Sequence, residues 1–176
     1  MDYRSYYPAP LRWLSNIVDL ILVLAGISII LLVFVNALLR GAAGFDLAWS
    51  LEVTAFLLLW STFIGCSAAI ARGAHMRVTE IVEHLFPVKS QRYLAILIDL
   101  ITLVIMLSLI KVGYSISSHT WAQTTTVLYW PVGLLYASLP VGMLISVIFH
   151  SYNLIWDIRF KPLPESHHND GSEDHP

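Results

Sequence analysis

Long apolar runs alternate with short polar segments along this chain. Four runs cover residues 16–39, 47–70, 93–114 and about 127–155. Each reaches the ~20 residues that a helix needs to cross a hydrocarbon core of about 30 Å. The first run is too long for the apolar core of a signal peptide, so we expect it to remain as an anchor. The pattern predicts an all-α integral membrane protein, an antiparallel bundle of four transmembrane helices within residues 16–157.

The composition supports a membrane protein. Hydrophobic residues make up 57 % of the 176 residues and charged residues 12 %, against roughly 45–50 % and about 25 % in soluble domains. Cys66 is the single cysteine, which excludes an internal disulfide and a cysteine metal cluster. The basic residues form no dense patch. We therefore expect membrane phospholipids, and no nucleic acid, among the partners.

The basic residues also predict the topology. Eight of the ten Lys and Arg lie in the two tails and the second loop, which share one side of a four-span protein. Because Lys and Arg are retained in the cytoplasm, both tails, residues 1–15 and 158–176, are predicted to be cytoplasmic. The second tail is polar and rich in Pro, Gly and acidic residues, so it is predicted to be disordered.

The second loop carries a helical pattern of its own. Val78, Ile81, Val82 and Leu85 follow the spacing of one apolar helix face, and Pro87 would end such a helix. A helix of about ten residues is too short to span. We therefore expect a short amphipathic helix over residues 76–86 on the cytoplasmic membrane surface.

Aromatic residues cluster at both ends of the spans. This pattern is typical of interfacial belts, so we interpret these side chains as membrane anchors: Tyr3, Tyr6, Tyr7 and Trp13 before the first span, and Trp121, Tyr129 and Trp130 before the fourth.

Ionisable residues inside spans are costly and are therefore candidates for function. Glu52 and Lys111 lie near the outer ends of the second and third spans, while Asp19 and Asp99 lie near the inner ends, close to arginines that include Arg72. None is at the midplane, where a proton or ion pathway usually places a carboxylate. We favour structural pairing, and the matched depth suggests a Glu52–Lys111 pair.

The second span has two distinct faces. Trp49, Phe56, Leu59 and Phe63 lie within about 60° of Glu52 at 100° per residue. Small residues follow another side and would permit close helix packing: Ser61, Gly65, Ala69 and Gly73. The two faces predict neighbours on both sides of this helix, and one of them could belong to another protein.

The fourth span contains Pro131 and Pro140. Proline in a helix frees a backbone carbonyl and kinks the helix. Broken helices can form ion sites in transporters, but there they occur as pairs in repeated halves. With one such helix, which carries no charge, we favour a bend that serves packing.

The sequence contains no phosphate loop, nucleophile motif or pair of metal ligands at helical spacing. His75, His84 and His150 lie near the inner edge, so a b-type haem is conceivable, but none is deep in a span. We expect no enzymatic activity and no cofactor.

Several of these features together resemble a known family. Trp49, Glu52, Trp60 and Gly65 are followed by "RGAHMRV", which includes Arg72 and His75. Later come Gly113 and "TTTVLYWPVGLLYASLPVG" (Thr124–Gly142), with Pro131, Tyr136, Pro140 and Gly142. In this order, across about Asn36–Ile145, they resemble the small membrane (DctQ-like) subunit of tripartite ATP-independent periplasmic (TRAP) transporters.

The resemblance implies a role in organic acid uptake across a bacterial or archaeal inner membrane. A periplasmic substrate-binding protein would capture the solute, and a large permease subunit of about a dozen spans would carry it in symport with sodium. The small subunit would bind and stabilise the large one as a scaffold, without a substrate or ion site. An alternative remains from another class, a self-sufficient four-helix exporter that couples to protons through Glu52.

Overall fold

The computed structural model describes residues 3–73 and 88–160, and all of its regular elements are helical. Four helices among the described residues are long and apolar enough to cross a membrane. The elements are η1 (Tyr3–Tyr6), α1 (Ala9–Ala43), α2 (Ala48–Ala71), α4 (Val88–His119), α5 (Val132–Tyr136) and α6 (Ser138–Phe160), where α5 and α6 together form the fourth span.

The first helix is longer than its apolar run. Pro10 lies in its first turn, where a missing backbone N–H costs nothing. Gly44 ends it in the left-handed conformation, with φ of 65°, and donates its N–H to the carbonyl of Leu39. Because polar Arg12, Ser15 and Asn16 are compatible with helix, α1 reaches well into the predicted N-terminal tail.

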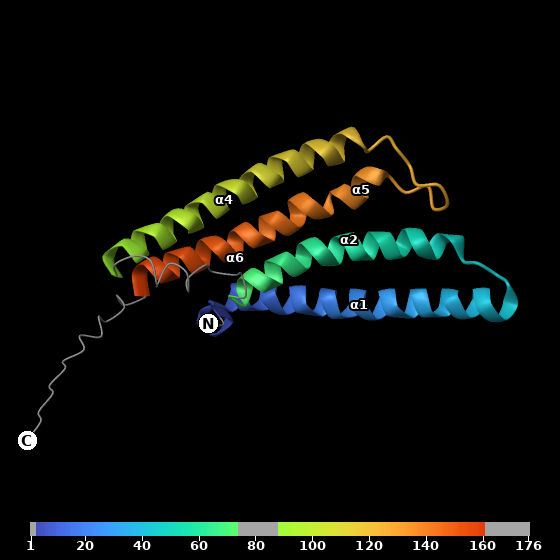
Figure 1. Cartoon of the computed structure of the whole chain (residues 1–176), viewed down its shortest axis with the longest axis horizontal. Helices are drawn as coiled ribbons and strands as arrows, with labels where there is room; N and C mark the ends of the chain where they lie inside the picture. Colours follow the sequence, from blue (N-terminus) through green and yellow to red (C-terminus); the bar gives the residue numbers. More distant parts are fainter. Residues whose placement is uncertain (1–2, 74–87, 161–176) are drawn as a thin grey trace, which may run out of the picture.

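The helices form an open row in the order α1, α2, α6, α4 (Figure 1). The two edge helices lie on opposite sides, with α2 and α6 between them. Each edge helix is antiparallel to its inner neighbour, whereas α2 and α6 run parallel. The expected antiparallel bundle is thus corrected to a flat row with a parallel central pair, because the fourth span inserts between the second and the third.

The central pair, α2 and α6, approaches closely at Gly142. At Gly142, an added Cβ would lie 2.6 Å from Cβ of Phe63 and 2.7 Å from the Phe63 carbonyl oxygen. Only glycine permits this approach of α6 to the backbone of α2. Close approach was expected at Gly65, but a Cβ there would meet only Cδ2 of Leu22 on α1, at 3.8 Å, which is an ordinary contact.

The fourth span breaks at Ala137, which separates α5 from α6. Pro140 has no N–H to donate to the Tyr136 carbonyl, so the helix is interrupted one turn before the proline. The proline packs on α4, where a Cβ at Gly113 would lie 2.9 Å from its Cδ. The expected bend at Pro140 is therefore present, and it serves packing.

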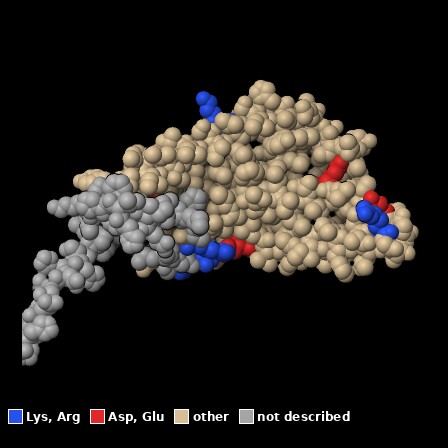
Figure 2. All heavy atoms as spheres, viewed as in Figure 1, with Lys and Arg blue, Asp and Glu red and all other residues tan. Residues whose placement is uncertain are grey.

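Most side chains on the surface are apolar, and charged groups are few on the face shown in Figure 2. The core lies between α2 and α6 and is extended by Met106 of α4 and by Tyr3 and Tyr7 of the N-terminal segment. The surface helix expected over residues 76–86, and most of the tail expected to be disordered, lie outside the described residues.

Candidate functional site

The carboxylate of Glu52 holds the loop between α4 and α5. Its Oε1 accepts hydrogen bonds from the Thr126 hydroxyl at 2.9 Å and the Val127 N–H at 2.8 Å, and its Oε2 accepts one from the Leu128 N–H at 2.8 Å. Successive backbone N–H groups of this kind form a concave site for an anion. Here the anion is a side chain of α2, so the contact joins the second span to the loop before the fourth.

The loop is folded as a short hairpin, which we call the Glu52-bound hairpin, residues 123–132. The Thr125 N–H donates to the Trp130 carbonyl at 2.9 Å, and the Val132 N–H donates to the Gln123 carbonyl at 2.8 Å. Tyr129 turns the chain with a φ of 56°, a conformation that non-glycine residues seldom adopt. Pro131 caps the start of α5, which begins at Val132, the last residue of the hairpin.

Aromatic side chains support this hairpin from α2. The ring of Phe56 lies 5.6 Å from that of Trp130, edge to face, and 5.7 Å from that of Trp60. Trp60 in turn donates its indole N–H to the Leu134 carbonyl of α5 at 3.3 Å. The face of α2 that carries Glu52 therefore meets the chain's own hairpin and fourth span.

The expected ion pair between Glu52 and Lys111 is not formed. The described residues give Glu52 no basic partner, and Lys111 is exposed on α4. Depth alone suggested the pair. In the observed row, α5 and α6 lie between α2 and α4 and separate the two side chains.

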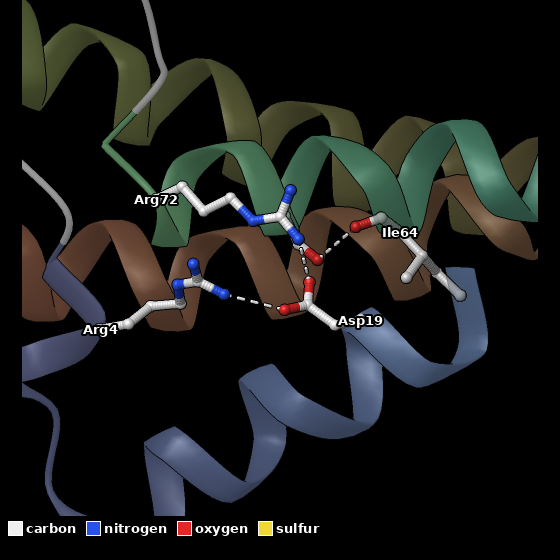
Figure 3. A network of polar contacts seen from close by, with 5 residues as sticks. Arg4, Asp19, Ile64 and Arg72 are labelled. Carbon is white, nitrogen blue, oxygen red and sulfur yellow. Dashed lines mark hydrogen bonds and ion pairs between the residues drawn. The ribbon is translucent and has the colours of Figure 1, made fainter. Parts of the chain in front are cut away.

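A second polar cluster lies at the opposite end, beside the N-terminus. Asp19 of α1 accepts from Arg4 at 2.9 Å and from Arg72 at 2.6 Å, one on each carboxylate oxygen (Figure 3). Arg72 follows the last turn of α2. The carboxylate thus joins the N-terminal segment, α1 and the end of α2, as expected for Asp19 from its depth.

Tyr3 and Tyr7 do not fit the expected interfacial belt, since both are buried, whereas Tyr6 and Trp13 are exposed. The Tyr7 hydroxyl donates to Oδ1 of buried Asn153 at 2.8 Å, and the Asn153 amide donates to the Ile70 carbonyl at 3.0 Å. The Tyr3 hydroxyl contacts the carboxylate of Asp157 at 3.0 and 3.1 Å. These tyrosines bind the N-terminal segment to α6.

The fourth span also meets α4 through a polar contact near this end. The ring nitrogen Nε2 of His150 lies 3.0 Å from the carbonyl of Asp99. Both residues, together with Tyr3 and Asn153, line a cavity of about 30 Å³. No group of three or more His, Cys, Asp or Glu among the described residues could hold a metal ion.

The remaining predicted positions are scattered along the row. Oγ of Ser61 is buried and has no hydrogen-bond partner among the described residues. Gly73 takes a positive φ of 65° just after α2, and His75 lies outside the described residues. Trp49 and Tyr136 are exposed, and Ala69 is half-buried. Both sides of α2 are occupied by helices of this chain, α1 and α6, so neither needs another protein.

Asn36 makes a contact that the sequence did not predict. Its Oδ1 accepts the Leu47 N–H at 2.8 Å and so caps the start of α2 from α1. A polar amide in an otherwise apolar run was the available signal. The role of the hairpin was also missed, because backbone N–H donors are common to nearly every residue type.

Comparison with known proteins gives the family. Residues 29–160 match the family of tripartite ATP-independent periplasmic transporters, DctQ component. The chain is 31 % identical over 122 residues to the ectoine TRAP transporter small permease protein TeaB of Halomonas elongata, a match that covers 68 % of this chain and 63 % of that protein. It is 27 % identical over 146 residues to a protein of Haemophilus influenzae that is described as a putative TRAP transporter small permease protein. This match covers 78 % of this chain and 88 % of that protein.

The match thus spans less than two thirds of the Halomonas protein, but the family match covers most of this chain. The resemblance in the second span and in the hairpin region falls within the matched residues. The family consists of transporter permeases and not of enzymes. The chain belongs to the DctQ family and is a multi-pass small permease subunit of a TRAP transporter.

Proposed function

We propose that this chain is the non-transporting scaffold of its transporter. It binds a large permease subunit, which carries a small organic acid together with sodium, after a periplasmic binding protein has delivered the solute. The observation that carries this proposal is the environment of Glu52. Both oxygens of the carboxylate are engaged by the hairpin, so this group fixes a loop in place.

The other well-placed carboxylate supports the same role. Asp19 is shared between two arginines, a contact that ties three segments together. The fourth span breaks at Ala137, and Pro140, next to this break, packs on α4. These groups stabilise the fold, which suits a scaffold better than a carrier, and they give no support to the exporter that would use Glu52.

The proposed orientation has both termini in the cytoplasm of a bacterial or archaeal inner membrane. The end of the row that holds the N-terminus and the end of α6 carries Arg4, Arg12, Arg72 and Arg159, whereas the opposite half carries Arg40 and Lys111. The difference follows the positive-inside rule. In this orientation the Glu52-bound hairpin faces the periplasm, where it is available to the binding protein.

Purification in mild detergent, with the adjacent transporter genes co-expressed, tests the proposal. We expect a much larger polytopic protein to co-purify. In liposomes, sodium-driven uptake of a panel of small carboxylates, with ectoine included because the Halomonas relative is named for it, should require that large subunit. Uptake by this chain alone would contradict the scaffold role.

Glu52→Gln separates the scaffold from the exporter. The amide keeps the size but offers one acceptor oxygen in place of two, so the hairpin should loosen. We expect amide exchange at Val127 and Leu128 to become about tenfold faster, while the complex still transports with unchanged sodium dependence. Loss of transport in an intact complex with a well-ordered hairpin would instead make Glu52 an ion carrier.

A further inference from the structure

We infer that the outer edge of α4 is the surface that docks on the large permease, and that the partner places a carboxylate against Lys111. The inference rests on the proposed function and assigns its interface. It starts from a polar stripe on the exposed side of α4, in the half next to the hairpin. The stripe consists of Ser108, Lys111, Ser115, Ser118 and His119, all exposed.

Lys111 is the charged member of the stripe, and it forms no ion pair among the described residues. Two other members of the stripe are bonded within the helix: Ser118 Oγ donates to the Ser115 carbonyl at 2.8 Å, and His119 Nδ1 lies 2.6 Å from the same carbonyl. Lys111 belongs to a candidate span, Tyr93–His119. At 1.5 Å per residue it lies about 12 Å before the end of that helix.

The direction of the helix works against escape of the ammonium group to water. The Cα–Cβ bond in a helix tilts toward the N-terminus. For Lys111 this is toward the middle of the span, away from the nearer end of α4 at His119. Snorkelling is therefore less favourable than for a lysine at the start of a helix. Ionisable residues at such depths usually pair or face protein.

The opposite edge of the row has a different chemistry. Between residues 20 and 38, every exposed residue of α1 is apolar, as lipid requires. In Figure 2, basic atoms project from the upper edge, over α4, with no acidic atoms beside them on that face. The exposed residues 97–107 of α4 are also apolar, so the two edges differ in the half of α4 next to the hairpin. There the α4 edge is suited to an acidic group of a partner, whereas the α1 edge is suited to lipid.

Charge also selects among the occupants of this edge. A second copy docked symmetrically through α4 would place two Lys111 side chains on the same interface, because a two-fold contact pairs a surface with itself. Like charges there would oppose association. A different protein that presents a carboxylate would pair with the Lys111 ammonium group. In the proposed function, the membrane-embedded partner of this chain is the large permease, so we assign the edge to it.

The test places a photo-reactive amino acid at position 111, or at position 31 on the α1 edge as the matched control, in the co-expressed complex. Leu31 lies among apolar residues of α1 and is 55 % exposed. We expect cross-links from position 111 to the large permease and few from position 31. Cross-links from 111 only to lipid, or to a second copy of this chain, would overturn the inference.

Charge variants provide the second readout. Lys111→Glu should lower the yield of co-purified large permease about tenfold, Lys111→Met less, and Lys111→Arg little, since a buried pair that loses one partner is strongly weakened. The melting temperature of each variant chain alone should match the wild type, because Lys111 has no contact to lose. Full recovery of the complex with Lys111→Glu contradicts the inference. If the wild-type chain captures no large permease, the proposed function itself fails.

Discussion

The two inner helices and the two edge helices of the row are built differently. In the most apolar 18-residue window, 22 % of residues are buried in α2 and 33 % in the fourth span, against 6 % in both α1 and α4. The inner pair is fixed by close packing at Gly142 and by polar contacts at each end. The edges depend on what surrounds the molecule. In such a subunit the contacts that fix the fold lie between the inner helices, and the edge helices are open to lipid and partner proteins.

Gly142→Leu should have the largest effect, because it separates the inner pair. The new side chain would collide with the backbone of Phe63, and we expect a loss of about 3 kcal/mol or more in the free energy of unfolding. Thermal unfolding in detergent measures it. Gly26→Leu is the matched control on α1, where an added Cβ meets nothing within 4 Å. If both variants melt alike, the difference between centre and edge disappears.

Asn153→Leu tests the polar part of the centre. It leaves the Tyr7 hydroxyl and the Ile70 carbonyl without their partner in a buried site, which costs about 2–3 kcal/mol. Tyr7→Phe in the same background should recover part of this loss, since the hydroxyl is then absent. Additive losses in the double variant would show that the two side chains do not act together.

Asp19→Asn weakens the link between an edge helix and the centre. The ion pairs are partly exposed, with 26 % of the Asp19 side chain accessible, so solvent screening limits the loss to about 1 kcal/mol. The difference from the wild type should shrink in high salt when unfolding is followed at low and high ionic strength. A loss that salt does not change would point to packing as the cause.

Leu31→Ala should have the smallest effect. The side chain is on the exposed face of α1, and we expect a change within about 0.5 kcal/mol for the purified chain. Met106→Ala is the comparison on α4, where Met106 is buried against the core, and about 2 kcal/mol or more should be lost. Equal effects would mean that the edge residue is covered.

The sequence was sufficient for the four spans, because apolar length alone defines a transmembrane helix. It was not sufficient to predict which spans lie next to one another in the row. In lipid, an apolar face can meet either a helix or an acyl chain, so the periodicity of the second span did not reveal that both neighbours belong to this chain. From the sequence, Gly142 could not be distinguished from Gly65. Only Gly142 lies at a close approach between helices.

The sequence predicted the membrane depth of the polar residues, but it predicted their bonding partners only in part. Asp19 found the arginine expected for it, since few cations share its level. Glu52 did not, because its partners are mostly backbone N–H groups that become available only once the hairpin has folded. The amphipathic character of tyrosine suits both a membrane interface and a wet end of the core. For this reason Tyr3 and Tyr7 could not be told from Tyr6.

The order of the row has a consequence for biosynthesis. The third span is made before the fourth, yet α4 packs mainly on α6 and α5, which follow it in the chain. At about 5–20 residues per second, the roughly 40 residues that separate their ends take about 2–8 s to synthesise. During that interval a newly inserted α4, with its lysine, lacks the two described helices on which it mainly packs. The order of translation therefore leaves this helix open to a chaperone, the insertion machinery or a waiting partner subunit.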